Sequence, residues 1–219
     1  MSKPPRRFPR LAILLACVLA LPCVATEPVQ GVDTDWVLQA VARPSPSSTP
    51  FVELRDSPML RQPLRLQGEY QHHVDGSLVR RVESPYRETT TLTAGEVVIE
   101  REGRAPRRVA LRQVPELAAI QAGFGALLSG DRELLQQTYE VQAQGVREHW
   151  ALRLVPRESR LAAALAWIEL HGRGSELRCV ESHPAKGDPL YTLMAGAAVA
   201  AAGEDDPSAL AALCRADAR

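Results

Sequence analysis

The sequence predicts an α+β protein in which one curved antiparallel sheet is accompanied by a few short helices. Stretches with apolar residues at every second position follow one another along the chain, with short turns between them. Stretches with apolar residues three and four positions apart interrupt this pattern. The twist of successive hairpins would curve such a sheet. No apolar run reaches the roughly 20 residues that a membrane-spanning helix needs.

The segment 1–25 has the three parts of a secretory signal peptide. A start with four basic residues and no acidic one is followed by an apolar segment at 11–21, which Pro22 ends. Small residues then precede an expected cleavage site after Ala25. A second interpretation is lipidation at Cys17, which lies in the lipoprotein-box-like sequence Leu14-Leu15-Ala16-Cys17. We therefore expect an exported protein, soluble after cleavage of the leader.

Removal of this leader leaves a slightly acidic chain. The leader takes four of the 26 basic residues and none of the 26 acidic ones, so 22 basic and 26 acidic residues remain, a formal charge of −4. No basic face indicates nucleic-acid binding. Cys179 and Cys214 are the cysteines that remain, and an oxidising compartment would allow them to form a disulfide. Two buried thiols would fit the sequence as well.

The first half of the mature chain predicts one helix and then a series of hairpins. Trp36, Val37 and Val41 recur at helical spacing, which predicts a helix over 33–42, and the Ser/Pro-rich segment 44–50 predicts a loop. Asp75-Gly76 is a turn signal between two alternating stretches. The strands expected in this half are 51–55, 64–71, 78–82, 88–93, 96–102 and 107–112.

Helical spacing returns at Pro115, and further hairpins follow. Pro115 suits the first turn of a helix, Gly130 its carboxyl-terminal cap, and Asp131 the start of a second, shorter helix. The domain is expected to span 32–194. The Ala-rich tail 195–219 is either a mobile extension or a docked helical segment. The remaining expected strands are 138–143, 148–155, 166–171, 176–182 and 190–194, with a helical turn at 157–164 and a helix at 208–216.

No enzyme motif accompanies these elements. The sequence contains no Gly-x-Ser-x-Gly elbow, no His-Glu-x-x-His and no phosphate-binding loop. His72 and His73 are neighbours on an expected strand, so their side chains point to opposite faces and cannot chelate one ion together. We expect a protein that is not an enzyme and that uses no cofactor and no metal.

The order of the parts resembles the divergent, LolA-like branch of the outer-membrane lipoprotein carriers. The resemblance covers about residues 32–194 and rests on order and spacing. The segments that carry it are Phe51-Val52-Glu53, Leu64 to Tyr70, Leu78 to Val82 with Ser84-Pro85, Thr89 to Glu100, Leu128-Ser129-Gly130-Asp131 and Trp150 to Pro156. The sequence departs from the family at Val74-Asp75-Gly76-Ser77, where the family has an arginine that latches its lid. Arg80 and Arg81, which follow a few positions later, are the candidates to replace it. Another acyl lipid is therefore a plausible cargo beside a lipoprotein.

The resemblance implies a periplasmic carrier with the fold of a half-open barrel, whose apolar concave face is covered by helices. Such a carrier takes the acyl chains of a lipoprotein or other lipid from an inner-membrane donor and delivers them to an outer-membrane acceptor. The alternative is a periplasmic binding or sensor module of the same fold, with a filled core and a protein partner. No motif indicates an oligomeric state.

An apolar lining suits a carrier because an acyl chain in water costs about 0.8 kcal/mol per methylene. Alternation shows burial only, so each lining candidate fits a filled core as well as a cavity. The inward-facing residues expected from the sheet are Leu66, Tyr70, Val79, Val98, Val109, Leu111, Trp150, Leu152, Leu154, Ile168 and Leu170. The helix stripe expected to cover them is Leu117, Ile120, Phe124 and Leu127.

Overall fold

Aspartate side chains cap the first turns of two of the helices. The computed structural model describes residues 31–55, 63–113 and 123–216, so the expected signal peptide lies outside the described residues. Helix α1 (Thr34–Val41) begins where Asp33 Oδ1 accepts a hydrogen bond from the backbone N–H of Trp36 at 2.8 Å. Helix α3 (Arg132–Thr138) begins in the same way at Asp131, after Gly130 has ended the helical segment 123–129 at a φ of 71°.

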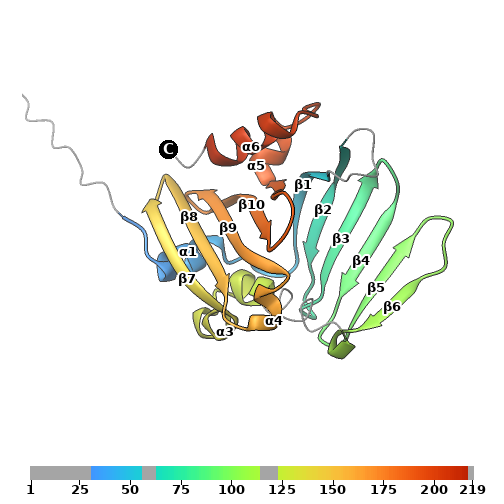
Figure 1. The fold of residues 1–219 in the computed structure, drawn as a ribbon, viewed down its shortest axis with the longest axis horizontal. Coiled ribbons are helices and arrows are strands. Elements are labelled where there is room, and N and C mark those ends of the chain that lie inside the picture. Colours follow the sequence, from blue (N-terminus) through green and yellow to red (C-terminus); the bar gives the residue numbers. More distant parts are fainter. Residues whose placement is uncertain (1–30, 56–62, 114–122, 217–219) are drawn as a thin grey trace, which may run out of the picture.

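The strands of the described chain form one eleven-stranded antiparallel sheet that is curled and not closed (Figure 1). Its order is β6-β5-β4-β3-β2-β1-β11-β10-β9-β8-β7, so the meanders β1–β6 and β7–β11 are joined by the pairing of β1 with β11. This confirms the predicted α+β class. The bounds are β1 Ser47–Arg55, β2 Leu64–His72, β3 Leu78–Ser84, β4 Glu88–Leu92, β5 Glu96–Arg101, β6 Arg107–Ala110, β7 Tyr139–Val146, β8 His149–Pro156, β9 Leu165–Arg173, β10 Glu176–Pro184 and β11 Leu190–Met194.

The packed helices define an inner and an outer face of the sheet. Helix α1, the segment 123–129, α3 and α4 (Ser159–Ala162) pack on the inner face of β7–β10. Helices α5 (Ala195–Ala200) and α6 (Pro207–Ala216) pack on the outer face, over β1, β10 and β11 (Figure 1). A disulfide between Cys179 of β10 and Cys214 of α6 ties the tail down, so the tail is docked. None of the described helices combines the length and apolarity that crossing a membrane requires.

Two elements differ from the sequence-based expectation. Residues 47–50, expected as a loop, are the first part of β1 and pair with β2. Strand β11 pairs with β1 only at Phe51–Glu53, so β1 has a free side over 47–50, where Pro50 is tolerated. Leu111 does not continue the strand expected at 107–112, because it turns away from the sheet in a 3₁₀ turn, Leu111–Gln113.

Candidate functional site

The inner face of β7–β10 is filled by side chains. Helix α1 packs against Trp150, which is 1% exposed and whose indole N–H donates to the carbonyl of Gly174 at 2.9 Å. The gap left beside the segment 123–129 is about 10 Å³, no more than one water needs. Several residues expected to line or cover a cavity therefore belong to a packed core: Leu127, Trp150, Leu152, Leu154, Ile168 and Leu170.

A pocket of about 240 Å³ lies where the inner face of β1–β4 is left open toward the segment 123–129. Strands β1–β4 form the floor of the pocket. Its walls come from the segment 123–129, from Arg43 and from strands β10 and β11. Most of its lining is apolar. The lining residues are Arg43, Ser47, Thr49, Tyr70, Gln71, His72, Leu78, Arg80, Thr90, Leu92, Phe124, Leu128, Leu177 and Met194. Of the residues expected to line a cavity, Tyr70 and Phe124 are the described ones that reach this pocket.

The strand register decides which side chains face this pocket. Arg80 pairs with both Tyr70 and Thr90, so these three residues share the inner face. Val79 and Val98 both lie in register with Thr91, which places them on the outer face. Their prediction as inward residues was wrong. Leu78-Val79 and Val97-Val98 are adjacent apolar pairs, and periodicity does not tell which member of such a pair faces inward.

The other expected lining residues lie away from the pocket. Leu66 is fully buried with Phe51 and Val82 in a small separate cluster on the inner face. Val109 pairs with the inward-facing Val97 near the edge of the sheet, outside the pocket lining. Leu111 is buried in the 3₁₀ turn beyond β6. Leu117 and Ile120 lie outside the described residues.

A buried carboxylate stands on the inner face beside the pocket. Glu53 of β1 has a side chain that is 3% exposed. Its Oε1 accepts from Arg55 Nε at 2.5 Å and from Arg80 Nη2 at 3.4 Å, and its Oε2 accepts from the Thr192 hydroxyl at 3.3 Å. The Arg80 guanidinium also lies over the Phe51 ring, 4.6 Å from its centroid. This arrangement holds the charged side chain of Arg80 on the floor of a mostly apolar pocket.

Sequence reasoning named Arg80 only as a candidate for the family's missing lid arginine and did not place it on the inner face, because a charged residue in an alternating strand is normally assigned to the solvent face. The signal that could have found it is the alternation of Leu78, Arg80 and Val82, which places an arginine between two residues that prefer burial. The neighbouring Arg81 points to the other face and pairs with Glu69 across 3.7 Å.

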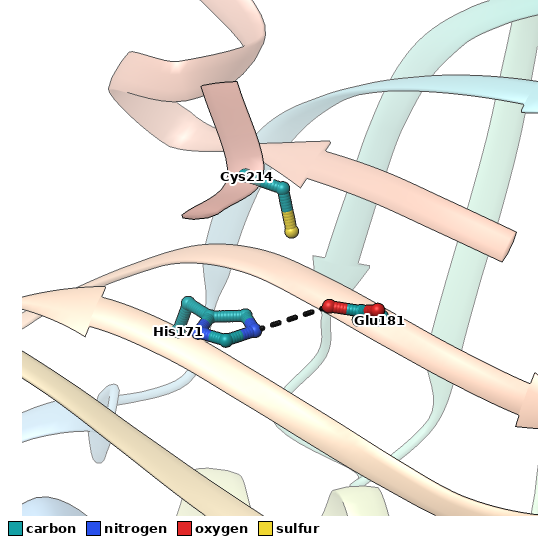
Figure 2. Close-up of side chains that lie close together, drawn as sticks. All are labelled: His171, Glu181 and Cys214. Atoms are coloured by element: carbon teal, nitrogen blue, oxygen red, sulfur yellow. Dashed lines mark hydrogen bonds and ion pairs between the residues drawn. The ribbon is translucent and has the colours of Figure 1, made fainter. Parts of the chain in front are cut away.

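A second cluster of polar side chains lies on the outer face, beside the disulfide. Figure 2 shows His171, Glu181 and Cys214, whose nearest ligand-type atoms all lie within 4.8 Å of one another. The Cys214 sulfur is bonded to Cys179 and is therefore not a thiolate. Arg215 Nη2 donates to Glu181 at 2.8 Å. This donor set indicates an anchor for α6 rather than a metal centre.

Glu181 is the centre of that anchor. His183 Nε2 and His171 Nε2 hydrogen-bond to its carboxylate at 2.8 and 3.4 Å, in addition to Arg215. Burial by itself would raise the pKa of Glu181, but the hydrogen bonds from His171 and Arg215 outweigh it and lower the pKa to about 2. The Glu181 carboxylate of the folded protein is therefore ionised near neutral pH.

Comparison with known proteins gives a family match and likenesses to solved structures. A family model described as "Outer membrane lipoprotein carrier protein LolA-like" matches residues 25–218. The LolA superfamily protein NE2245 from Nitrosomonas europaea is 12% identical, with a TM-score of 0.37 over 74% of this chain and 76% of that one. LprF from Mycobacterium bovis is 10% identical, with a TM-score of 0.33 over 74% of this chain and 91% of that one. No curated protein matches the sequence.

Proposed function

This chain belongs to the LolA-like outer membrane lipoprotein carrier family, and we propose that it is a periplasmic carrier that holds an acyl chain of a lipoprotein or another lipid in its inner-face pocket. Membership supports a fold for binding lipid or lipoprotein. The observation that carries the proposal is the pocket itself. It opens on the inner face beside a packed core, and its lining includes apolar side chains such as Leu78, Leu92 and Met194.

In this role the protein receives its cargo from a donor at the inner membrane and delivers it to an acceptor at the outer membrane. The leader would bring the chain to the space between them. The role is binding and not catalysis. No carboxylate and no thiol is among the residues that line the pocket, so the lining offers few groups for acid–base or nucleophilic chemistry.

A carrier must bind tightly enough to shield the chain and weakly enough to release it. Burial of about ten methylenes contributes about 8 kcal/mol, which corresponds to a Kd of about 1 μM. The loss of translational freedom on binding lowers the affinity further. A pocket of about 240 Å³ therefore suits reversible binding of part of one chain.

The filled half of the inner face favours a second candidate, a binding or sensor module with a protein partner. In that case the packing of α1 against Trp150 would extend the core, and the pocket would hold no lipid. The two candidates differ in whether the protein carries an amphiphile when it is isolated from cells.

The test is to purify the mature protein from the cell envelope, extract it with organic solvent and identify bound lipids by mass spectrometry. Thr90→Trp places an indole on the pocket floor, whereas Thr91→Trp places it on the outer face of the same strand. We expect the Thr90→Trp protein to lose most of its bound lipid and the Thr91→Trp protein to keep it. Lipid-free wild-type protein that also takes up no acyl probe would contradict the carrier role and favour the second candidate.

The mature amino terminus decides how the carrier would operate. Cleavage after Ala25 gives a protein that diffuses between the membranes, and lipidation at Cys17 gives a tethered one. Intact-mass measurement of the protein from the envelope separates these two products. We expect the product cleaved after Ala25.

A further inference from the structure

We infer that the pocket selects amphiphiles with a negatively charged head, and that Arg80 is the residue that receives this head. The inference rests on the proposed lipid-binding function and names the class of ligand for the same pocket. The ligand would combine one aliphatic chain with a carboxylate or a phosphate. Three features of the described residues carry the inference: the charges on the lining, the sharing of Glu53 between Arg80 and Arg55, and the unused donors of Arg80.

The formal charges on the pocket lining are both positive. Arg43 and Arg80 belong to the lining, and no aspartate or glutamate does. Tyr70 adds no negative charge, since burial raises the pKa of its hydroxyl, although the nearby Arg80 acts in the opposite direction. A mostly apolar pocket whose charged lining residues are both arginines is complementary to an amphiphilic anion and disfavours an amphiphilic cation.

The charge of Arg80 is only partly balanced. Glu53 is shared between Arg80 and Arg55, so two guanidinium groups face one carboxylate. The bond from Arg55 is short at 2.5 Å, while the bond from Arg80 is 3.4 Å, longer than the 2.7–2.9 Å usual for a charge-assisted hydrogen bond. Glu53 is not part of the lining, and Arg80 is. The excess positive charge therefore lies on the pocket side.

Arg80 also has donors to spare. A guanidinium carries five N–H donors, and the acceptors described for Arg80 are Glu53 and Tyr70. Its side chain is 12% exposed, so bulk water supplies few of the missing acceptors. A carboxylate or phosphate in the pocket would accept from these donors, and the planar fork of the guanidinium suits both groups.

Arg43 differs in this respect. Its guanidinium donates to the backbone carbonyls of Ala40, Ala42 and Ser175. These bonds connect the end of α1 to the turn between β9 and β10, so the guanidinium of Arg43 holds these two segments together beside the pocket. Of the two arginines, Arg80 is the one whose geometry leaves room for a ligand.

The experiment uses four probes with the same sixteen-carbon chain and different heads: hexadecanoate, hexadecyl phosphate, hexadecan-1-ol and hexadecyltrimethylammonium. Each probe competes with the neutral fluorophore N-phenyl-1-naphthylamine for the mature full-length protein. We expect the two anions to bind roughly 10- to 100-fold more tightly than the alcohol, the range for a hydrogen bond to a charged group. The ammonium probe should bind more weakly than the alcohol. The ratio between the two anions tells which head the pocket prefers.

Two variants test the residue. Arg80→Met keeps an extended apolar side chain and removes the charge, so we expect the preference for anions over the alcohol to disappear and the affinity for the alcohol to stay within about threefold. Arg81→Met is the matched control on the outer face and should keep the full preference. If Arg80→Met does not fold because Glu53 is left with less pairing, the Glu53→Gln/Arg80→Met double variant removes both charges together and is expected to behave in the same way.

Each outcome bears on the inference. Equal affinity of the wild-type protein for anions and alcohol would overturn it and leave the carrier function standing. A preference that survives in Arg80→Met, or that Arg81→Met also removes, would overturn the role of Arg80. If none of the four probes displaces the fluorophore, the carrier function fails and the inference fails with it.

Discussion

Removal of the Cys179–Cys214 disulfide should cost this domain a large share of its stability. The disulfide links β10 to α6. Its two Cα atoms are 5.3 Å apart, and the two cysteines are 35 positions apart in sequence. A crosslink that closes a loop of this length restricts the unfolded chain and stabilises the native state by about 4 kcal/mol in the chain-entropy model. Both cysteines are buried, so Cys179→Ala/Cys214→Ala also removes packed sulfur atoms. The total loss should therefore be at least about 4 kcal/mol, compared with a typical domain stability of about 5–15 kcal/mol.

The assay is urea unfolding followed by tryptophan fluorescence and far-ultraviolet circular dichroism. It compares wild-type protein with and without a thiol reductant and the double-alanine variant. The reductant should lower the unfolding free energy of the wild type to nearly that of the variant and should leave the variant unchanged. A difference below about 1 kcal/mol between oxidised wild type and variant would refute the reasoning. It would mean that Leu210 packing and the Arg215–Glu181 pair hold α6 without help.

Two further predictions concern the outer anchor and the packed half of the inner face. Because the hydrogen bonds from His171 and Arg215 outweigh burial and lower the pKa of Glu181 to about 2 from a usual 4.5, the contribution of Glu181 to stability is fully present above about pH 4.5 and is lost as the pH falls toward 2. This contribution is worth up to about 3 kcal/mol. Unfolding free energies of wild type and Glu181→Gln between pH 2 and 6 should show the steeper loss only in the wild type, and parallel curves would contradict the role of Glu181. Gly172→Ala should destabilise the fold by roughly 1–3 kcal/mol, because the added Cβ would lie 2.0 Å from Trp150 Cζ2, while Gly95→Ala, which meets nothing within 4 Å, should change thermal stability little. Equal melting temperatures of the two glycine variants would show that the Trp150 ring can shift.

The sequence predicted the sheet well because its strands alternate and its turns carry clear signals. The caps at Gly130 and Asp131 were predictable for the same reason, since their side-chain and backbone requirements are local. The first part of β1 was not predictable. Its Ser/Pro-rich sequence is typical of a loop, and only the long-range pairing with β2 makes it a strand.

The candidate site was harder to predict than the fold. Alternation identified buried residues such as Trp150 and Leu152, but it cannot tell a residue that fills a core from one that lines a pocket. That difference depends on where α1 packs, which is a tertiary property. The alternation of Leu78, Arg80 and Val82 hints at an inward Arg80, but it cannot show what makes that position tolerable, because Glu53 from another strand offsets the cost of burying the charge.

The separation between the packed half and the pocket has a consequence for how this protein can evolve. Leu78, Thr90 and Leu92 line the pocket, but they belong to none of the buried clusters found in the described chain. Substitutions at these positions would alter the fit of a ligand without opening a void in the core beneath α1. Changes at these positions could therefore alter which ligand fits at little cost to stability, whereas large-to-small changes around Trp150 would open voids in the core and destabilise the fold.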